Sequence, residues 1–337
     1  MDLFSPGMDE LRTLVDARLS GWLSSRRAQL EHSAALIDEM KRLLDAGGKR
    51  LRPLFCYWGY RAAGGDHDDR IVRAAASLEL LHTFAIVHDD IMDASDERRG
   101  EPTVHARQGV NVALLVGDLA LVLADDLFIA SGFPSEVVTR AFRTYSRMRQ
   151  EVIVGQYLDI QAAHDPGIDE ERARLVARLK SGRYSIEEPL AIGASLAQAS
   201  ERARDELAAF GAPLGEAFQL RDDLLGLFGD RSSIGKPVDS DIREGKRNVL
   251  YAKTVASLPH PDRLFFMKRW GGGRDLDTAE VLRLRGLVES SGARTDTEVL
   301  LTRLVEESAA ALERASFDRQ SREALRELTR LATVRHV

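Results

Sequence analysis

The stretch that decides the fold is residues 78–93, LELLHTFAIVHDDIMD, in which a run of apolar side chains ends in three aspartates. Its apolar positions recur at the three- and four-residue spacing of a helix. The same spacing appears at Leu11 and Leu14 and again at Leu175 and Leu179. The chain shows no sustained period-two alternation, which is the pattern of a half-buried strand. We therefore predict an all-α fold in which residues 78–93 form one helix.

The chain length and the positions of glycine and proline clusters indicate the domain organisation. The chain has 337 residues, 44% of them apolar and 30% charged, so it can bury a large core. Glycine and proline clusters separate segments with the length of ordinary helices, and no low-complexity linker or convincing repeat is present. We predict one helical bundle domain over residues 1–337, with a subdomain from about Gly271 as the alternative.

The net charge and the length of the apolar runs limit the possible cellular location and partners of the protein. A formal net charge of -6 argues against a nucleic-acid partner, because phosphate backbones require a basic footprint. No uninterrupted apolar run has the roughly 20 residues that span a bilayer, and the first thirty residues lack the apolar centre of a secretory signal. The single cysteine, Cys56, lies in an apolar stretch. We expect a buried, inert thiol and a cytoplasmic protein without a transmembrane segment.

Three carboxylates lie at the end of the helix predicted for residues 78–93. Asp89 and Asp93 are four residues apart, so they lie one turn apart on one face, with Asp90 beside them. Mg²⁺ prefers oxygen ligands and is usually held by one or two carboxylates together with substrate phosphates. The alternative is a solvated, charged helix end. The apolar residues directly upstream favour a buried helix and a metal-binding role.

A second acidic pair, Asp222 and Asp223, lies near the end of another predicted amphipathic helix. Two such clusters facing each other would clamp a diphosphate through shared metal ions. A diphosphate also needs cationic donors. Each basic group of the chain could by itself be a solvated surface patch, but their joint occurrence with two acidic clusters indicates diphosphate binding. These groups are residues 48–53 (GKRLRP), residues 98–100 (RRG), Lys180 with Ser181, and Lys236 with Lys246.

The longest irregular stretch is residues 228–248, which contain several glycines and lysines. A loop of this length inside a compact domain is usually either functional or disordered. We predict a flap that contacts phosphate, with a solvated surface loop as the alternative.

Taken together, these motifs resemble those of the trans-isoprenyl diphosphate synthases, also called polyprenyl synthetases, over about residues 47–248. The matches are Gly-Lys-Arg-x-Arg-Pro (48–53), Asp-Asp-x-x-Asp (89–93) with Arg-Arg-Gly (98–100), Lys-Ser (180–181), Phe-Gln-x-x-Asp-Asp (218–223) and Gly-Lys-Pro (235–237). The resemblance implies a helical bundle around a central active-site cavity. It also implies a Mg²⁺-dependent homodimer that condenses isopentenyl diphosphate head to tail with an allylic diphosphate (dimethylallyl, geranyl or farnesyl) and releases pyrophosphate.

Carried over residue by residue, the resemblance implies several sets of site residues. The diphosphate of isopentenyl diphosphate is expected on Lys49, Arg52, His82 and Arg99. Three Mg²⁺ ions are expected on Asp89, Asp93 and Asp222. The allylic diphosphate is expected among Arg98, Lys180, Ser181, Lys236 and Lys246. Gln219 is expected near the developing allylic cation, and Asp90 and Asp223 complete the catalytic set.

The second acidic motif departs from the family pattern at one position. The family usually has a third aspartate where this chain has Gly226. We expect Asp222 and Asp223 to serve without it, and therefore expect Gly226→Asp to change turnover only modestly.

Product length is expected to depend on the residues just before the first motif. Phe84 lies five residues and Ala85 four residues before Asp89. In this family, an aromatic residue followed by a small one at these positions is typical of enzymes that make the C20 product. We therefore hypothesise geranylgeranyl diphosphate as the product, with farnesyl diphosphate next. The alternative is that Phe84 only fills the core.

Two rival functions are a class I terpene cyclase and a non-catalytic subunit of a heteromeric prenyl synthase. A cyclase shares the helical fold and an aspartate-rich helix, but it needs no site for isopentenyl diphosphate. The basic residues 48–53 and 98–99 therefore argue against the cyclase. A silent subunit would be expected to lose motif residues more widely.

Overall fold

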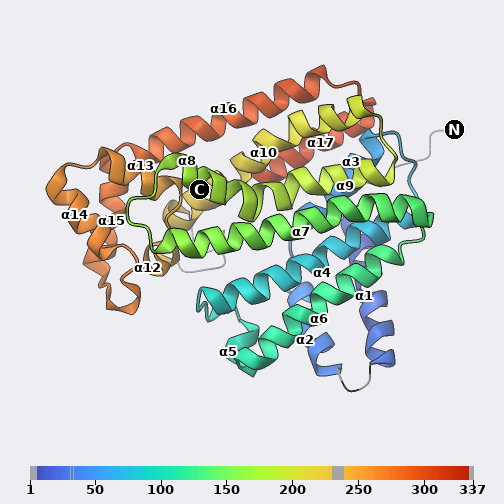
Figure 1. Ribbon diagram of the computed structural model, residues 1–337, viewed down its shortest axis with the longest axis horizontal. Coiled ribbons are helices and arrows are strands. Elements are labelled where there is room, and N and C mark those ends of the chain that lie inside the picture. The colour runs from blue at the N-terminus through green and yellow to red at the C-terminus, as the bar shows by residue number, and fades with distance from the viewer. Residues whose placement is uncertain (1–5, 31, 33, 230–238, 334–337) are drawn as a thin grey trace. The chain divides into compact units, whose positions relative to one another are not determined.

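The computed structural model describes residues 6–30, 32, 34–229 and 239–333, and these residues form helices almost throughout (Figure 1). The helices up to residue 163 are α1 (Met8–Gln29), α2 (Ala34–Asp45), α3 (Leu51–Ala62), α4 (Asp69–Met92), α5 (Val104–Gln108), α6 (Val110–Ile129) and α7 (Ser135–Ala163). The only strands in this described part of the chain are β1 (Glu97–Arg98) and β2 (Glu101–Pro102). The all-α prediction is confirmed.

The remaining helices complete the described chain. They are α8 (Glu170–Ala177), the π-helical η2 (Arg178–Glu187), α9 (Glu188–Leu196), α10 (Glu201–Phe228), α12 (Ser240–Glu244), α13 (Val249–Ser257), α14 (His260–Arg269), the 3₁₀ turn η3 (Gly273–Asp275), α15 (Thr278–Ser290), α16 (Ala293–Arg314) and α17 (Arg319–Thr333).

The contacts within the chain define two compact units. Unit 1 contains the described residues of Met1–Tyr145, Glu188–Ala208 and Ala315–Leu328. Unit 2 contains those of Ser146–Glu187, Ala209–Arg314 and Thr329–Val337. Because α7, α10 and α17 contribute residues to both units, neither unit is a continuous stretch of chain.

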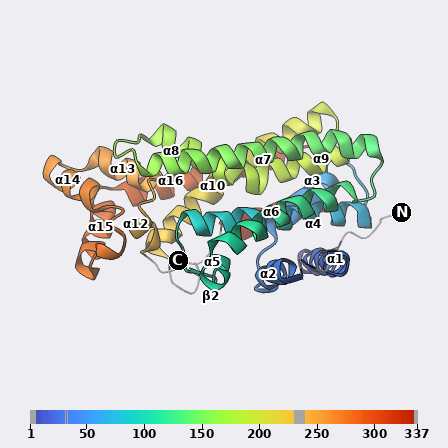
Figure 2. The same cartoon turned by 60° about the horizontal axis from the view of Figure 1, so that its bottom comes forward.

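Helix α4 is the central helix of unit 1. It packs against α1, α2, α3, α5, α6 and α9, and it runs beside α6 in both views (Figures 1 and 2). Asp68 is the N-cap residue of this helix, and its side chain accepts hydrogen bonds from the backbone N–H groups of Arg70 and Ile71. It is long and apolar enough to cross a membrane, but 72% of the apolar window is buried inside the protein. Its burial is therefore that of a core helix, and residues 78–92 lie in it as predicted.

Helices α3 and α9 approach each other closely in unit 1. A Cβ atom at Gly59 of α3 would lie 2.6 Å from the carbonyl oxygen of Leu190. A Cβ atom at Gly193 of α9 would lie 2.0 Å from the carbonyl oxygen of Cys56. Only glycine fits at such backbone contacts. Cys56 itself is fully buried, as predicted, and burial raises the pKa of its thiol.

The core of unit 2 is built around α13, which packs against α8, α14, α15 and α16. Tyr251 of α13 lies with its ring centroid 5.5 Å from those of both Phe266 and Trp270. The Trp270 indole N–H also donates to the carbonyl oxygen of Lys246 at 3.1 Å. This aromatic cluster therefore fixes the segment that follows α12.

We expect Gly193→Ala to lower the free energy of unfolding by about 3 kcal/mol, because the added methyl group would overlap the α3 backbone. Gly21→Ala is the matched control, since a Cβ atom at this helical position meets nothing within 4 Å. The free energy of unfolding of this control should rise by about 0.5–1 kcal/mol, because alanine has a better helix propensity than glycine. Urea denaturation of both variants measures the difference. Equal stabilities would contradict the close packing of α3 against α9.

Candidate active site

The three carboxylates of the first motif lie at the end of α4 in unit 1. Asp89 and Asp90 are in the last turn, and Asp93 ends the helix, with its N–H donating to the carbonyl oxygen of Asp89 at 2.8 Å. Asp90 is buried, with 3% of its surface exposed, whereas Asp89 and Asp93 are half-buried. Asp89 and Asp93 therefore have access to a ligand that Asp90 lacks.

Arg98 pairs with the buried carboxylate of Asp90. Its Nε lies 2.8 Å and 3.0 Å from the two carboxylate oxygens, and Nη2 lies 2.7 Å from Oδ1. Nη2 also lies 3.5 Å from Oδ2 of Asp89. Burial, the largest single effect, lowers the pKa of Arg98, but the charge and hydrogen bond of Asp90, together with the charges of Asp89 and Asp93, leave the pKa above its ordinary value. The sequence did not reveal this pairing, which gives Asp90 a structural task.

A short hairpin presents the two arginines of the second half of the motif. Strands β1 and β2 pair in antiparallel register, Arg98 opposite Glu101, around a turn in which Arg99 and Gly100 have φ of 55° and 78°. Two positive φ values are the requirement of a tight hairpin turn. The Arg99 guanidinium donates to the carbonyl oxygen of Gly47. The hairpin therefore brings Arg99 to the loop that carries the residue 48–53 motif.

Cations gather around His82 on α4. Burial and then the charges of Arg52, Arg99, Arg98 and Arg50 lower the pKa of His82 well below its ordinary value. The imidazole is therefore neutral at pH 7. Desolvation and the neighbouring arginines also lower the pKa of Arg99, although the charge of Glu79 acts in the opposite sense. An anion bound here would relieve the repulsion.

The members of the residue 48–53 motif differ in their surroundings. Arg50 is buried, and it pairs with Asp16 at 2.7 Å and with Glu79 at 3.1 Å. This arginine holds α1 and α4 to the start of α3, a role that the sequence did not reveal. Arg52 lies in the first turn of α3 and is half-buried, and Lys49 precedes Arg50, the N-cap residue of that helix. The charge of Arg52 acts on His82.

The second acidic pair lies on α10 in unit 2. Asp223 is buried, and the Gln219 side chain donates to its Oδ1 at 2.7 Å. Burial, together with the charges of Asp241 and Asp222, raises the pKa of Asp223 to about 8, against the effect of the Gln219 hydrogen bond. The carboxyl groups of Asp222, Asp223 and Asp241 are therefore close enough for their charges to interact. Asp241 of α12 is the member that sequence reasoning missed.

Lys180 and Ser181 lie on the π-helical segment η2 of unit 2. Long π-helical segments are rare and often occur at functional sites. The backbone of η2 has close contacts with other segments at two glycines. A Cβ atom at Gly155 would lie 2.4 Å from the N atom of Lys180, and a Cβ atom at Gly182 would lie 2.7 Å from the carbonyl oxygen of Gly215. The Lys180 Nζ donates to Oδ2 of Asp159 at 2.6 Å. Asp159 was not predicted.

The two lysines predicted for the flap have different outcomes. Lys236, with the Gly-Lys-Pro motif of residues 235–237, lies outside the described residues. Lys246 is described, and its Nζ lies 3.1 Å from Oε2 of Glu244 and 3.7 Å from Oδ1 of Asp241. Lys246 is thus next to the second acidic group.

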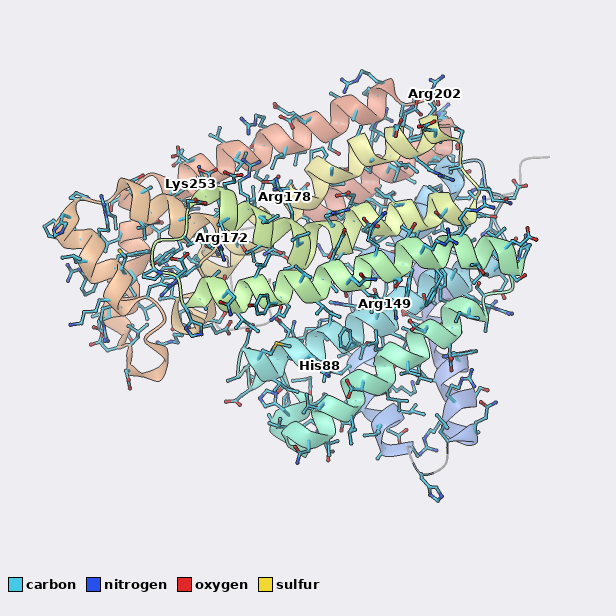
Figure 3. All side chains as sticks on the ribbon, in the orientation of Figure 1. His88, Arg149, Arg172, Arg178, Arg202 and Lys253 are labelled. Atoms are coloured by element: carbon cyan, nitrogen blue, oxygen red, sulfur yellow. The ribbon has the colours of Figure 1, made fainter. Side chains whose placement is uncertain are left out.

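Phe84 and Ala85 are half-buried on α4, one turn before Asp89. The Phe84 ring packs edge-on against His88, with centroids 4.9 Å apart. His88 lies where α4 passes α6 (Figure 3), and a Cβ atom at Gly117 of α6 would lie 2.3 Å from its Nε2. Nε2 also lies 3.2 Å from the carbonyl oxygen of Leu114, so it carries the proton of that hydrogen bond. Gly117 therefore makes room for the ring that supports Phe84.

Within the described part of the chain, no three His, Cys, Asp or Glu side chains are arranged to hold a metal ion by themselves. This arrangement suits Mg²⁺, which usually takes one or two protein carboxylates and completes its shell with phosphate oxygens and water. Asp89 with Asp93, and Asp222 with its neighbours, are donor sets of this kind.

Residues 33–275 match the polyprenyl synthetase family model. The chain belongs to the polyprenyl synthetase family. It is 38% identical over 239 residues to the geranylgeranyl diphosphate synthase of Sulfolobus acidocaldarius, and the match covers 70% of this chain and 72% of the relative. It is 34% identical over 288 residues to the geranylfarnesyl diphosphate synthase of Aeropyrum pernix, covering 84% of this chain and 89% of the relative.

A solved structure gives the same result for the fold of this polyprenyl synthetase. The crystal structure of geranylgeranyl pyrophosphate synthase from Corynebacterium glutamicum, complexed with isoprenyl diphosphate and magnesium, is similar with a TM-score of 0.93 and 33% identity. The match covers 98% of this chain and 100% of that one. The protein is therefore a trans-prenyltransferase, and the predicted family, fold and reaction class are confirmed.

We expect Asp90→Asn to lower the free energy of unfolding of this synthetase by about 3 kcal/mol, because it leaves the charge of Arg98 without its main partner. Asp89→Asn should change it by less than about 1 kcal/mol, because the longer contact to Arg98 is weak. Urea denaturation without metal compares the two isosteric variants. Equal losses would contradict the structural role assigned to Asp90.

Proposed function

We propose that this trans-prenyltransferase makes geranylgeranyl diphosphate from isopentenyl diphosphate and an allylic diphosphate. The observation that carries the proposal is the arginine cluster around His82, on the same helix as Asp89 and Asp93. Cations that repel one another favour an anionic ligand, and carboxylates on the adjoining turns favour the metal ions that accompany a diphosphate.

The diphosphate of isopentenyl diphosphate is assigned to Lys49, Arg52, His82 and Arg99. The planar guanidinium groups of Arg52 and Arg99 can donate pairs of hydrogen bonds to phosphate oxygens. A neutral His82 can donate one hydrogen bond without adding a further charge to the cluster. The hydrogen bond from Arg99 to Gly47 limits the rotamers of its side chain before substrate arrives.

Mg²⁺ is assigned to Asp89, Asp93 and Asp222, with three ions when both substrates are bound. A precedent is the similar Corynebacterium glutamicum synthase, whose crystal structure is a complex with isoprenyl diphosphate and magnesium. Asp89 and Asp93 are half-buried, whereas Asp90 is buried, so these two carboxylates are the ones of this motif that a ligand can reach. When bound, Mg²⁺ supplies electrostatic stabilisation of the charge that develops on pyrophosphate.

The allylic diphosphate is assigned to Arg98, Lys180, Ser181, Lys236 and Lys246. As the allylic C–O bond breaks, these donors stabilise the negative charge that passes to pyrophosphate. Asp159 holds the Lys180 ammonium by a hydrogen bond, so this charge is oriented in advance. Arg98 is likewise held by Asp90.

The carbon–carbon bond forms when the double bond of isopentenyl diphosphate attacks the allylic carbon. Gln219 is assigned a place near the developing cation, and its side-chain hydrogen bond to Asp223 orients its amide. The proton lost in the final step goes to the departing pyrophosphate, so the reaction needs no dedicated side-chain base. Closure of the predicted flap, residues 228–248, would exclude the water that quenches the cation.

The remaining assignments concern the molecule as a whole. We infer that residues 1–337 act as one catalytic domain, because α7, α10 and α17 belong to both units. A homodimer is supported by a stripe of exposed apolar residues on α6. The stripe consists of Val110, Leu114, Leu115, Val122 and Ile129.

The net charge of -6 argues against a nucleic-acid partner, and we assign the protein to the cytoplasm.

The packing around Phe84 supports the C20 product. His88 packs against the ring, and Gly117 and the Leu114 carbonyl hold His88 in place. An aromatic side chain that is fixed in this way is suited to stop a growing apolar chain. Relatives that make longer and shorter products, such as the geranylfarnesyl diphosphate synthase of Aeropyrum pernix, show that chain length varies within the family.

The function is tested by incubating the protein with Mg²⁺, isopentenyl diphosphate and one allylic primer at a time, followed by chromatography of the dephosphorylated products. We expect geranylgeraniol as the main alcohol. A main product shorter or longer than C20 would contradict the assigned length. Cyclic hydrocarbons would indicate a terpene cyclase. If no primer is turned over, the protein would instead be a non-catalytic subunit.

Phe84→Ala should shift the product distribution to chains longer than C20, because it removes the ring that limits elongation. Phe142→Ala is the matched control, since Phe142 is a half-buried aromatic residue of the same unit that packs against Phe128 and Tyr145. The control should keep the C20 product. An unchanged length in the Phe84 variant would mean that Phe84 only fills the core.

A further inference from the structure

The loop of residues 47–50 in unit 1, the GGKR loop, has an unusual backbone conformation. Gly47 and Arg50 have positive φ angles of 88° and 51°. Glycine adopts such angles readily, but for an arginine the left-handed region is unfavourable and persists where the surrounding structure enforces it. Lys49, which is assigned to the diphosphate of isopentenyl diphosphate, lies within this loop. The contacts that hold Arg50 therefore also determine where Lys49 lies.

The Arg50 side chain contacts three helices. Its Nε donates to Oδ1 of Asp16 on α1 at 2.7 Å, and Nη1 donates to Oε2 of Glu79 on α4 at 3.1 Å. Nη2 donates to the carbonyl oxygen of Leu44 on α2 at 2.6 Å. Arg50 has 6% of its surface exposed. Every nitrogen of this guanidinium thus donates to the protein itself, so Arg50 holds the loop in place.

Helix α1 contacts the GGKR loop through a second residue. Arg12 lies four residues before Asp16, so both side chains are on one face of α1. The Nε of Arg12 donates to the carbonyl oxygen of Lys49 at 3.3 Å. One face of α1 therefore contacts both the backbone of Lys49 and the side chain of Arg50.

The GGKR loop also contacts Arg99, another residue assigned to the diphosphate. The Arg99 guanidinium donates to the carbonyl oxygen of Gly47. A Cβ atom at Gly48 would lie 3.2 Å from Nη1 of Arg50 and 3.3 Å from both Nη atoms of Arg99. The two guanidinium groups are therefore packed together beside Gly48. A displacement of Arg50 would change the space that Arg99 occupies.

We propose that α1 positions the GGKR loop for isopentenyl diphosphate, with Asp16 holding the side chain of Arg50 and Arg12 holding the backbone of Lys49. The inference rests on the proposed function, which assigns Lys49 to this diphosphate. Helix α1 lies outside residues 33–275, the part of the chain that matches the family model. Asp16 and Arg12 act through the loop, so they are positioning residues and not ligands.

The expected effect on binding follows from preorganisation. A loop that is already held in its binding conformation loses less conformational freedom when the substrate binds. Without Asp16, Arg50 keeps Glu79 and Leu44 as partners, so the protein should fold. The GGKR loop could then leave its binding conformation, which lowers the affinity for isopentenyl diphosphate. The affinity for the allylic diphosphate, which is assigned to other residues, should change little.

A purely electrostatic role of Asp16 predicts the opposite sign. Asp16 is an anion near a cationic site, so loss of its charge alone would strengthen the binding of a diphosphate. The Asp16 side chain is 51% exposed, and solvent therefore screens this effect. A lower affinity in a variant without Asp16 indicates lost positioning and not lost charge.

The first experiment compares hydrogen exchange in Asp16→Ala and in the matched control Arg18→Ala, both without substrate. Arg18 also lies on α1 and forms an ion pair with Asp69 in the first turn of α4. The control therefore weakens the attachment of α1 while Asp16 and Arg12 keep their contacts with the loop. Amides of the GGKR loop should exchange about tenfold faster or more in Asp16→Ala, and within about twofold of the wild type in Arg18→Ala. Wild-type exchange in Asp16→Ala, or equal exchange in both variants, would overturn the proposal.

The second experiment measures KM for each substrate in the same variants. Asp16→Ala should raise KM for isopentenyl diphosphate by about fivefold or more, and change kcat and KM for the allylic primer by less than about twofold. Asp16→Asn keeps an oxygen that can accept from Nε of Arg50, so its KM for isopentenyl diphosphate should lie closer to that of the wild type. Arg18→Ala should leave both KM values within about twofold of the wild type.

Three kinetic results would contradict the positioning role. They are an equal rise of both KM values in Asp16→Ala, the same rise in Arg18→Ala, and an Asp16→Asn variant as impaired as Asp16→Ala. The exchange measurement separates this inference from the proposed function. If the GGKR loop loosens in Asp16→Ala but the wild type elongates no primer, the proposed function fails while the positioning of the loop by α1 stands.

Discussion

The burial of charged side chains near the ends of apolar helices is the constraint on which most of this structure depends. In unit 1, α4 carries Asp90 into the interior, where the carboxylate is stable because the hairpin supplies Arg98. The hairpin in turn exists because Arg99 and Gly100 accept positive φ values. The position of Arg99 in the arginine cluster around His82 follows from the same turn.

Unit 2 meets the same constraint in a different way. Asp223 is buried on α10, where Gln219 stabilises one of its oxygens and burial raises its pKa to about 8. Asp241 adds a further carboxylate in the space beside Gly226. The first acidic group is thus built around an internal ion pair, whereas the second is arranged in a manner that a cation would stabilise. This difference is physical, and it is not evident from two similar aspartate motifs.

Local patterns in the sequence predicted the helices and the residue types of the site. The spacing of apolar residues and the run of aspartates define residues 78–93 without reference to any other part of the chain. The tasks of individual residues could not be predicted in this way, because they depend on contacts between distant segments. Examples are Arg98 on Asp90, Lys180 on Asp159, and Asp241 beside Gly226. Along the sequence, a glycine in place of an aspartate is a lost ligand, whereas in the structure it is the space that another carboxylate occupies.

The central claim is that protein carboxylates bind Mg²⁺ jointly with a diphosphate and not alone. Isothermal titration of the wild-type protein with Mg²⁺, with and without inorganic pyrophosphate, tests it most directly. The structure predicts weak or undetectable binding of Mg²⁺ alone, because no described group of three ligands holds a metal, and strong binding when pyrophosphate is present. Equal affinity under both conditions would contradict the account.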